Sequence, residues 1–174
     1  MLARLDATDW RILKELQANG RITNVELARK VGISPPPCLR RMRALEQSGI
    51  IAGYFALLDE KQLGFQLIAY VSVGLHSQSE ADLRAFENRI LAWPLVREAE
   101  MLSGEADFIL KCVAPDLTSF QDFIIQELTA APNVASVKST LVIRRVKFEP
   151  GVPVALAQES AKSTSGRGPR VKRG

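Results

Sequence analysis

Arginine is concentrated in residues 35–47, where the sequence Pro-Pro-Pro-Cys-Leu-Arg-Arg-Met-Arg-Ala-Leu-Glu-Gln contains one acid, Glu46. If this segment is a helix, with about 100° per residue, its basic residues share one face. That face consists of Pro36, Arg40, Arg43 and Gln47, with Arg41 on its flank. Arginine suits the edge of guanine and glutamine that of adenine, and any arginine can also hold a phosphate. The face therefore suits double-stranded DNA, although an ordinary solvated helix face could carry the same residues.

The opposite face of the same segment is apolar, so the helix needs other elements to pack against. Its members are Cys38, Leu39, Met42 and Leu45. Two shorter helices are predicted before it, over about residues 6–18 and 23–31. Asp6 is placed to cap the first, and Thr23 with Glu26 has the spacing of a capping box for the second. The turn Gly32-Ile33-Ser34 then leads into the arginine-rich helix, which is the pattern of a helix-turn-helix.

Ser34 has an unusual position before three prolines. A capping serine accepts hydrogen bonds from the second or third helical N–H, but Pro36 and Pro37 have none. We therefore expect the Ser34 hydroxyl to be free to contact a phosphate.

The remainder of the chain predicts strands and helices in alternation. Residues 50–58 suggest a linking strand, and residues 66–146 then give the order β-α-β-β-α-β, a ferredoxin-like arrangement. The predicted strands are 66–75, 96–102, 107–113 and 134–146, with helices opened by Ser79 and Asp116. Two helices on one face of a four-stranded sheet leave the other face for a second subunit.

These elements predict an α+β protein with four parts. Residues 1–50 form the helix-turn-helix, 51–65 a linking strand and hinge, 66–149 an αβ domain for dimerisation and effector binding, and 150–174 a disordered basic tail. Net charge follows the same division: +4 over residues 1–58, −4 over 59–150 and +4 over 151–174. The tail could touch DNA or be an idle solubilising end.

Composition excludes several other classes of protein. No apolar stretch approaches the ~20 residues of a membrane span, and the N-terminus lacks the apolar region of a secretory signal. The two cysteines, Cys38 and Cys112, are far apart, which argues against a disulfide framework and favours the cytoplasm. With one histidine and no Cys-x-x-Cys, neither a metal site nor a cofactor is expected.

The combined motifs resemble the leucine-responsive regulator/asparagine-regulator (Lrp/AsnC) family over about residues 5–148. The matching runs are Leu5-Asp6-x-x-Asp9-x-x-Ile12-Leu13-x-x-Leu16-Gln17-x-x-Gly20-Arg21, Asn24-Val25-Glu26-Leu27-Ala28, Val31-Gly32-x-Ser34-Pro35-x-Pro37-Cys38-Leu39-x-Arg41 and Ile50-Ile51-x-Gly53-Tyr54. The resemblance implies a winged helix-turn-helix joined to an αβ sandwich that dimerises, with dimers commonly assembling into octamers. It also implies transcriptional regulation by an amino acid or related effector, and it adds Asn24 to the DNA-binding candidates.

The family's effector pocket lies between dimers near a Ser-Gly-Asp-x-Asp-Tyr-like stretch. Here the stretch reads Ser103-Gly104-Glu105-Ala106-Asp107-Phe108, so Gly104 and Asp107 match, whereas Glu105 is longer than aspartate and Phe108 lacks a phenol. The resemblance makes Ser103, Gly104, Glu105 and Asp107 the candidate effector-binding residues. Gly104 could equally be an ordinary turn residue.

Two other functions are open to this sequence. Some relatives with this architecture resemble haem-pathway decarboxylases that depend on histidine, but His76 is the only histidine here and no nucleophile–base pair is visible. An interaction or ligand-storage module with vestigial DNA binding is the third possibility. The arginines at 40, 41 and 43 favour a DNA-binding regulator, not an enzyme.

Overall fold

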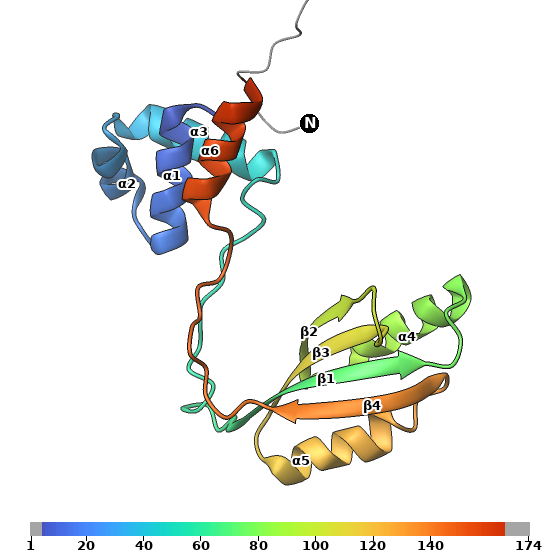
Figure 1. The fold of residues 1–174 in the computed structure, drawn as a ribbon. Coiled ribbons are helices and arrows are strands. Elements are labelled where there is room, and N and C mark those ends of the chain that lie inside the picture. Colours follow the sequence, from blue (N-terminus) through green and yellow to red (C-terminus); the bar gives the residue numbers. More distant parts are fainter. Residues whose placement is uncertain (1–4, 166–174) are drawn as a thin grey trace, which may run out of the picture. The chain divides into compact units, whose positions relative to one another are not determined.

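The computed structural model describes residues 5–165, which divide into two compact units (Figure 1). One unit is Met1–Leu57 together with Glu149–Gly174, and the other is Leu58–Phe148. The chain therefore passes from the first unit to the second after Leu57 and returns after Phe148.

Three helices form the centre of the first unit: α1 (Ala7–Ala18), α2 (Asn24–Val31) and α3 (Pro35–Gln47). The predicted caps are confirmed, because Asp6 accepts from the N–H groups of Thr8 and Asp9, and Thr23 forms a capping box with Glu26. Gly32 ends α2 with φ of 77°, a left-handed conformation that glycine adopts without strain. The buried side chains of this unit are Ile12, Leu16, Leu27, Ala28, Val31, Cys38 and Leu45.

Arg41 connects α3 to the start of α1. Its guanidinium Nη1 lies 2.6 Å from Asp6 Oδ2 and 2.8 Å from Asp9 Oδ1, so one cation bridges two carboxylates. The N–H of Asp9, and then the Arg41 guanidinium, lower the pKa of Asp6 below its ordinary 3.8. The capped end of α1 and the middle of α3 are thereby held together by charge as well as by apolar packing.

The second unit is a four-stranded antiparallel sheet in the order β2-β3-β1-β4. Its strands are β1 (Leu67–Leu75), β2 (Val96–Met101), β3 (Phe108–Ala114) and β4 (Val134–Leu141). This is the predicted ferredoxin-like order, with β1 and β3 in the centre. Strands β1 and β3 alternate between buried and more exposed residues, so one face of the sheet carries the core.

Two helical segments cover that face. Helix α4 (Glu80–Ala92) begins at Ser79, and α5 (Leu117–Asp122) begins at Asp116 and continues as a π-helical turn, Phe123–Leu128. Four aromatic residues of the core pack edge-on or tilted, with ring centroids 5.1–5.8 Å apart. They are Phe86, Trp93, Phe108 and Phe123. The opposite face of the sheet has no helix over it in the described part of this chain, and Tyr70 at its centre is 42% exposed.

Three predictions about the connecting segments are wrong. Residues 50–58 form no strand, because no other strand lies beside them to accept pairing. Strand β4 ends at Leu141 instead of residue 146. The Val142 N–H still donates to the carbonyl oxygen of Ile68, but β1 begins at Leu67 and has no residues to pair with 144–146. The expected disordered tail from residue 150 instead contains helix α6 (Val154–Ser165); residues 166–174 lie outside the described range.

Asp6 provides a test of how the three helices are held together. Asp6→Ala should destabilise this unit by about 1 kcal/mol, because the first turn of α1 loses its cap. Asp6→Asn keeps a capping oxygen and removes only the charge. Because the folded pKa of Asp6 is lowered, its ionic contribution is present at neutral pH and disappears as pH falls from 3.8 through that lower pKa.

Hydrogen exchange of peptides from residues 5–50 would measure these effects. The wild type should exchange more slowly than Asp6→Asn at pH 6, and the difference between the two proteins should shrink as the pH falls below 3.8, after correction for intrinsic rates. A difference that does not shrink over this range would contradict the ionic role of Asp6.

Candidate DNA-binding and effector-binding sites

Helix α3 presents the predicted face to solvent. Pro36, Arg40, Arg43 and Gln47 are all exposed, whereas Cys38 and Leu45 on the other face are buried. Within the described part of the chain, neither Arg40 nor Arg43 forms an ion pair or hydrogen bond. Two guanidinium groups therefore project from a rigid helix with all their donors available.

Arg41 lies differently from its neighbours. Its pairing with Asp6 and Asp9 leaves the side chain 36% exposed, and both carboxylates compete with any phosphate for the same guanidinium. The structure thus separates the three arginines into two that are free to bind a ligand and one that fixes the helix.

Asn24 also contacts α3 through its side chain. Its Nδ2 donates a hydrogen bond of 2.9 Å to the carbonyl oxygen of Pro35, joining the first residue of α2 to the first residue of α3. The Oδ1 atom of Asn24 is buried and has no partner among the described residues. Asn24 therefore sets the spacing between the two helices of the motif.

Ser34 is the N-cap of α3 and makes no side-chain capping bond, as its prolines predict. Its carbonyl oxygen accepts from the N–H of Cys38 at 3.3 Å, so the backbone of the first turn is satisfied while the hydroxyl stays available. The proline run has a second consequence. Since residues 35–37 have no N–H, this helix start offers a phosphate the Ser34 hydroxyl in place of backbone amides.

Glu46, the only acid on α3, forms a hydrogen bond with the segment that follows the helix. The Tyr54 hydroxyl donates a hydrogen bond of 2.9 Å to Glu46 Oε1. Glu46 is half-buried, in contrast to the exposed Arg40 and Arg43. The acid therefore serves a local contact with the linker.

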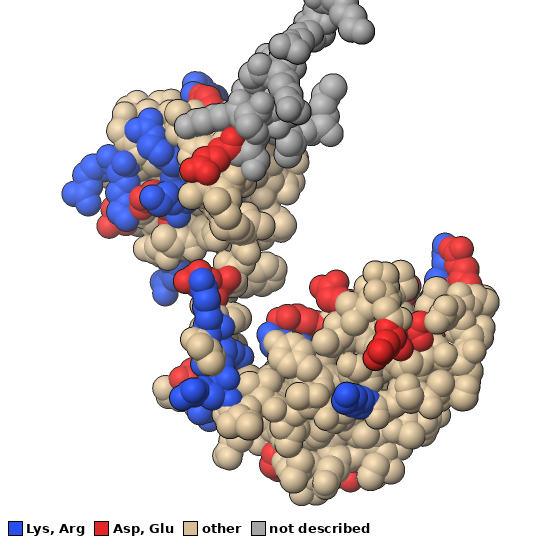
Figure 2. All heavy atoms as spheres, in the orientation of Figure 1, with Lys and Arg blue, Asp and Glu red and all other residues tan. Residues whose placement is uncertain are grey.

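Basic side chains also gather beyond α3. Figure 2 shows Lys and Arg grouped on the side of the first unit where α2 lies in Figure 1. Arg21 before α2 and Arg29 within it are both exposed. Sequence reasoning missed them because it followed α3 alone; the signal available was their position in the first helix of the helix-turn-helix, which crosses the DNA backbone in such motifs.

The candidate effector residues lie around the turn between β2 and β3. Ser103, Gly104 and Glu105 are exposed, and Glu105 makes no polar contact within the described residues. Gly104 does not have a positive φ, and a Cβ atom built on it meets nothing within 4 Å. Neither backbone conformation nor packing within this chain therefore explains a glycine at this position.

The carboxylate of Asp107 forms hydrogen bonds with the loop after β1 and not with that turn. Its Oδ2 accepts from the N–H of Leu75 and its Oδ1 accepts from Gln78 Nε2, each at 2.7 Å. The carboxylate thus ties the loop after β1 to the start of β3. The structure brings Asp107 to the same end of the sheet as Ser103–Glu105, but its carboxylate is already occupied by protein donors.

The same loop is fixed from a second side. Asn133, with φ of 70°, accepts from the N–H of Ser77 at 2.8 Å and donates to its carbonyl oxygen at 2.7 Å. The Ser77 hydroxyl donates to Asp82 and, together with the Ser79 hydroxyl, lowers the pKa of that carboxyl. Sequence reasoning missed this network, because Asn133 and Ser77 are 56 residues apart.

His76, the histidine weighed for catalysis, is exposed just after the end of β1. Burial raises the pKa of the Cys38 thiol and raises that of Cys112 to about 12. Among the described residues, no cluster of three or more His, Cys, Asp or Glu side chains could hold a metal ion. No described helix has both the length and the apolar character required to cross a bilayer.

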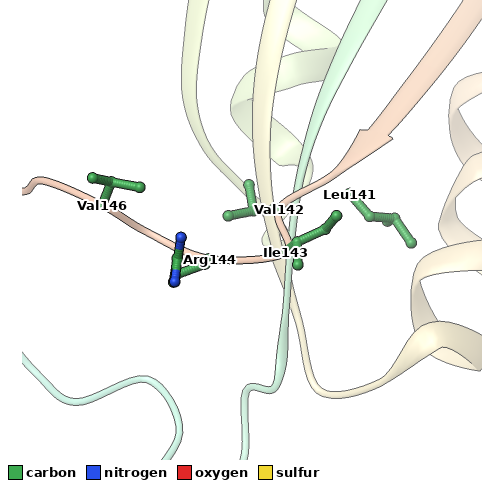
Figure 3. Close-up of a pocket in the computed structure, with 5 residues that line it drawn as sticks. All are labelled: Leu141, Val142, Ile143, Arg144 and Val146. Atoms are coloured by element: carbon green, nitrogen blue, oxygen red, sulfur yellow. The ribbon is translucent and has the colours of Figure 1, made fainter.

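An open hollow lies beside the chain that leaves β4 (Figure 3). It is lined by Leu141, Val142, Ile143, Arg144 and Val146. Ile143 is fully exposed and Val146 is 86% exposed, so apolar side chains face solvent on both sides of the arginine.

Both units match known families. Residues 5–52 match the family model described as winged helix-turn-helix DNA-binding, and residues 68–152 match that of the Lrp/AsnC ligand binding domain. The chain is 62% identical over 143 residues to the leucine-responsive regulatory protein of Rhizobium meliloti, which covers 82% of this chain and 92% of that protein. It is 40% identical over 153 residues to the Bkd operon transcriptional regulator of Pseudomonas aeruginosa, covering 88% and 100% of the two chains.

Solved structures show the same likeness in three dimensions. A transcriptional regulator from Neisseria meningitidis, solved as a complex with L-Met, has a TM-score of 0.84 at 35% identity and covers 88% of this chain and 99% of its own. An AsnC family regulator from Agrobacterium tumefaciens has a TM-score of 0.82 at 29% identity, covering 87% and 99%. With both units matched in order and nearly over their full lengths, the chain belongs to the Lrp/AsnC family of transcriptional regulators.

Proposed function

We propose that this regulator reads operator DNA with α3 as a homodimer and adjusts that binding through an amino acid held at its αβ domains. The single observation that carries the DNA-binding part is the free, exposed pair Arg40 and Arg43 on the outward face of α3. Gln47 extends this face by one helical turn. A recognition helix inserted in the major groove needs such unpaired donors, because protein partners would otherwise compete with the bases.

The other candidates take different roles in the proposal. Ser34, Arg21 and Arg29 hold phosphates, and Pro36 lies against the groove without donating. Arg41 and Asn24 act as positioning residues, since their polar atoms are engaged with α1 and α3. This assignment places base contacts on α3 and backbone contacts around it, the usual division in protein–DNA interfaces.

The second subunit covers the helix-free face of the sheet in this proposal. Support comes from the exposed Tyr70 and from the half-buried Ile109 and Val113, which would be unusually apolar for a solvated face. The exposed side chains of Ile143 and Val146 add apolar surface that a second subunit would cover. Two copies would present two α3 helices to half-sites about 34 Å apart. Assembly of dimers into octamers follows from the family resemblance.

We place the effector at the turn containing Ser103, Gly104 and Glu105. Glu105 supplies a free carboxylate for an ammonium group, and the turn supplies backbone N–H groups for a carboxylate. Asp107 keeps the site's shape by holding the neighbouring loop. The relative from Neisseria meningitidis, solved with L-Met, supports an amino acid as the effector. A cytoplasmic location follows from the DNA partner, and no enzymatic step is assigned.

Replacement of single arginines tests the reading role of α3. Arg40→Ala or Arg43→Ala should weaken binding to a selected duplex by about 1–3 kcal/mol if the residue contacts a base, and should reduce the preference for that duplex over a scrambled one. Fluorescence anisotropy at two salt concentrations measures both quantities. Arg84→Ala on α4, which removes an exposed arginine from the second unit, serves as the matched control.

Loss of affinity for both duplexes by the same factor would assign the arginine to phosphate. Wild-type affinity in both α3 variants would contradict the proposed interface.

Ser34 offers a separate test of phosphate contact. Because its hydroxyl makes no capping bond, Ser34→Ala should leave the thermal stability unchanged while lowering the affinity for every duplex by about 0.5–1.5 kcal/mol. Thr23→Ala, which does remove a cap from α2, is the comparison for a purely structural effect. An unchanged affinity and salt dependence in Ser34→Ala would exclude the contact.

Gly104 tests the effector site without disturbing the fold. Because a Cβ atom at this position meets open space, Gly104→Val should fold with a midpoint within a few degrees of the wild type. The variant should lose the shift in DNA affinity that an amino acid produces in the wild type. The test uses the twenty amino acids individually in the anisotropy assay.

An undiminished effector response in Gly104→Val would place the ligand elsewhere. If no amino acid shifts wild-type affinity while DNA binding persists, the effector part of the proposal fails and the DNA-binding part stands.

A further inference from the structure

The chain that returns from the αβ unit is fastened to the end of α1 by a glutamine. Gln17 donates through Nε2 to the carbonyl oxygens of Val152 at 2.8 Å and Pro150 at 3.4 Å. Gly151 between them has φ of 95°, and a Cβ atom there would lie 3.0 Å from Gln17 Nε2. The Gln17 side chain therefore occupies the space that the glycine leaves, and a residue with a side chain would be strained at position 151.

Helix α6 continues from this anchor and lies against α1 in the same unit (Figure 1). Its first turn is closed by the carbonyl oxygen of Pro153, which accepts from the N–H groups of Leu156 and Ala157 at 3.0 and 3.2 Å. Val154, Ala157 and Gln158 are half-buried at the spacing of one helix face. The match to the family's ligand-binding domain ends at residue 152, so α6 lies beyond the matched region.

The outgoing chain is held near the same end of α1. A Cβ atom built on Gly20 would lie 3.5 Å from Cδ1 of Tyr54, and the Tyr54 hydroxyl donates to Glu46 at the end of α3. Gly20 follows Gln17 by three positions. The two segments that join the first unit to the αβ unit are thus both fastened where α1 ends.

An ion pair fastens the same two segments at their other ends, within the αβ unit. Nη2 of Arg145 lies 2.9 Å from Oε1 of Glu60, and the guanidinium lowers the pKa of that carboxyl. Tyr54 and Glu60 are six positions apart, and so are Arg145 and Gly151. The units are therefore linked by two tethers of equal length, each at most about 20 Å long.

We propose that residues 149–159 form a strap, which gives the first unit a second anchored connection and so limits how far this unit can twist relative to the αβ unit. A body on one flexible tether can turn about it, whereas two tethers fastened at both ends wind around each other and shorten. The regulatory consequence rests on the proposed function. An effector at the αβ unit can influence α3 only if the two units do not turn independently.

Two variants release the strap without removing it. Gln17→Glu places a carboxylate against two carbonyl oxygens, and Gly151→Val adds a side chain that collides with Gln17 at a φ that valine disfavours. Amides of residues 154–159 should then exchange about three- to tenfold faster, while those of α2 and α3 keep their rates. Gln121→Ala, which removes an exposed glutamine from α5, is the matched control.

Distances between spin labels, one in each unit, test the limit on twisting. Labels on Val25→Cys and Glu87→Cys occupy exposed positions of α2 and α4, and the native Cys38 and Cys112 are buried. Labelled protein is diluted with excess unlabelled protein, so that only distances within one chain are measured. The distance distribution should widen in both release variants and keep the wild-type width in Gln121→Ala.

Faster exchange of the strap with an unchanged distance distribution in both variants would overturn the limit on twisting. Wild-type exchange rates in both variants would overturn the anchor at Gln17 and Gly151.

DNA binding separates the strap from the proposed function. Release should also reduce the shift in DNA affinity that an amino acid produces in the wild type. A widened distribution with an undiminished shift would overturn the regulatory role of the strap and leave the proposed function intact. Absence of DNA binding by the wild type would defeat the proposed function, while the label distances would still decide whether the strap limits twisting.

Discussion

The seating of α3 against α1 and α2 is the constraint on which DNA recognition by this protein depends. Burial of Cys38 and Leu45 fixes which side of α3 faces inward, and the bridge from Arg41 to Asp6 and Asp9 fixes where it lies along α1. The bond from Asn24 to Pro35 sets its distance from α2. These contacts place Arg40 and Arg43 on the outward face of α3, where their side chains project into solvent. Recognition is therefore a consequence of packing on the opposite face.

The two faces of the sheet in the αβ unit also differ in packing. The helix-covered face holds the aromatic core, whereas the other face has no helix over it in the described chain. At one end of the sheet, Asp107 and Asn133 fix the loop after β1, while the neighbouring turn at Gly104 is left open. Rigid surroundings of this kind suit the effector site proposed at this turn, because the protein would lose little conformational freedom on binding.

Local chemistry allowed much of this structure to be predicted from the sequence. The caps at Asp6 and Thr23, the turn at Gly32 and the free hydroxyl of Ser34 depend on residues within a few positions, and each prediction is confirmed. The strand order was predictable from alternation and from the β-α-β-β-α-β pattern. The family resemblance, carried by runs such as Asn24–Ala28, is confirmed by the matches to both units.

Contacts between distant residues could not be predicted in the same way. Arg41 has the sequence environment of its neighbours, and only its ion pair with Asp6, 35 positions away, distinguishes it. The apolar residues 50–58 suggested a strand, but a strand also needs a partner at its edge, and none is present in the described chain. Composition rich in Gly, Ser and Lys hid the apolar spacing at Val154 and Ala157 that docks α6 on the first unit.

Selection of bound duplexes from a random pool, with purified full-length protein at moderate ionic strength, tests the central claim most directly. If α3 reads base edges from a dimer, the enriched sequences should share two half-sites related by two-fold symmetry, with centres about 10 base pairs or a multiple of that apart. Recovery of random sequences, with or without amino acids present, would contradict the account.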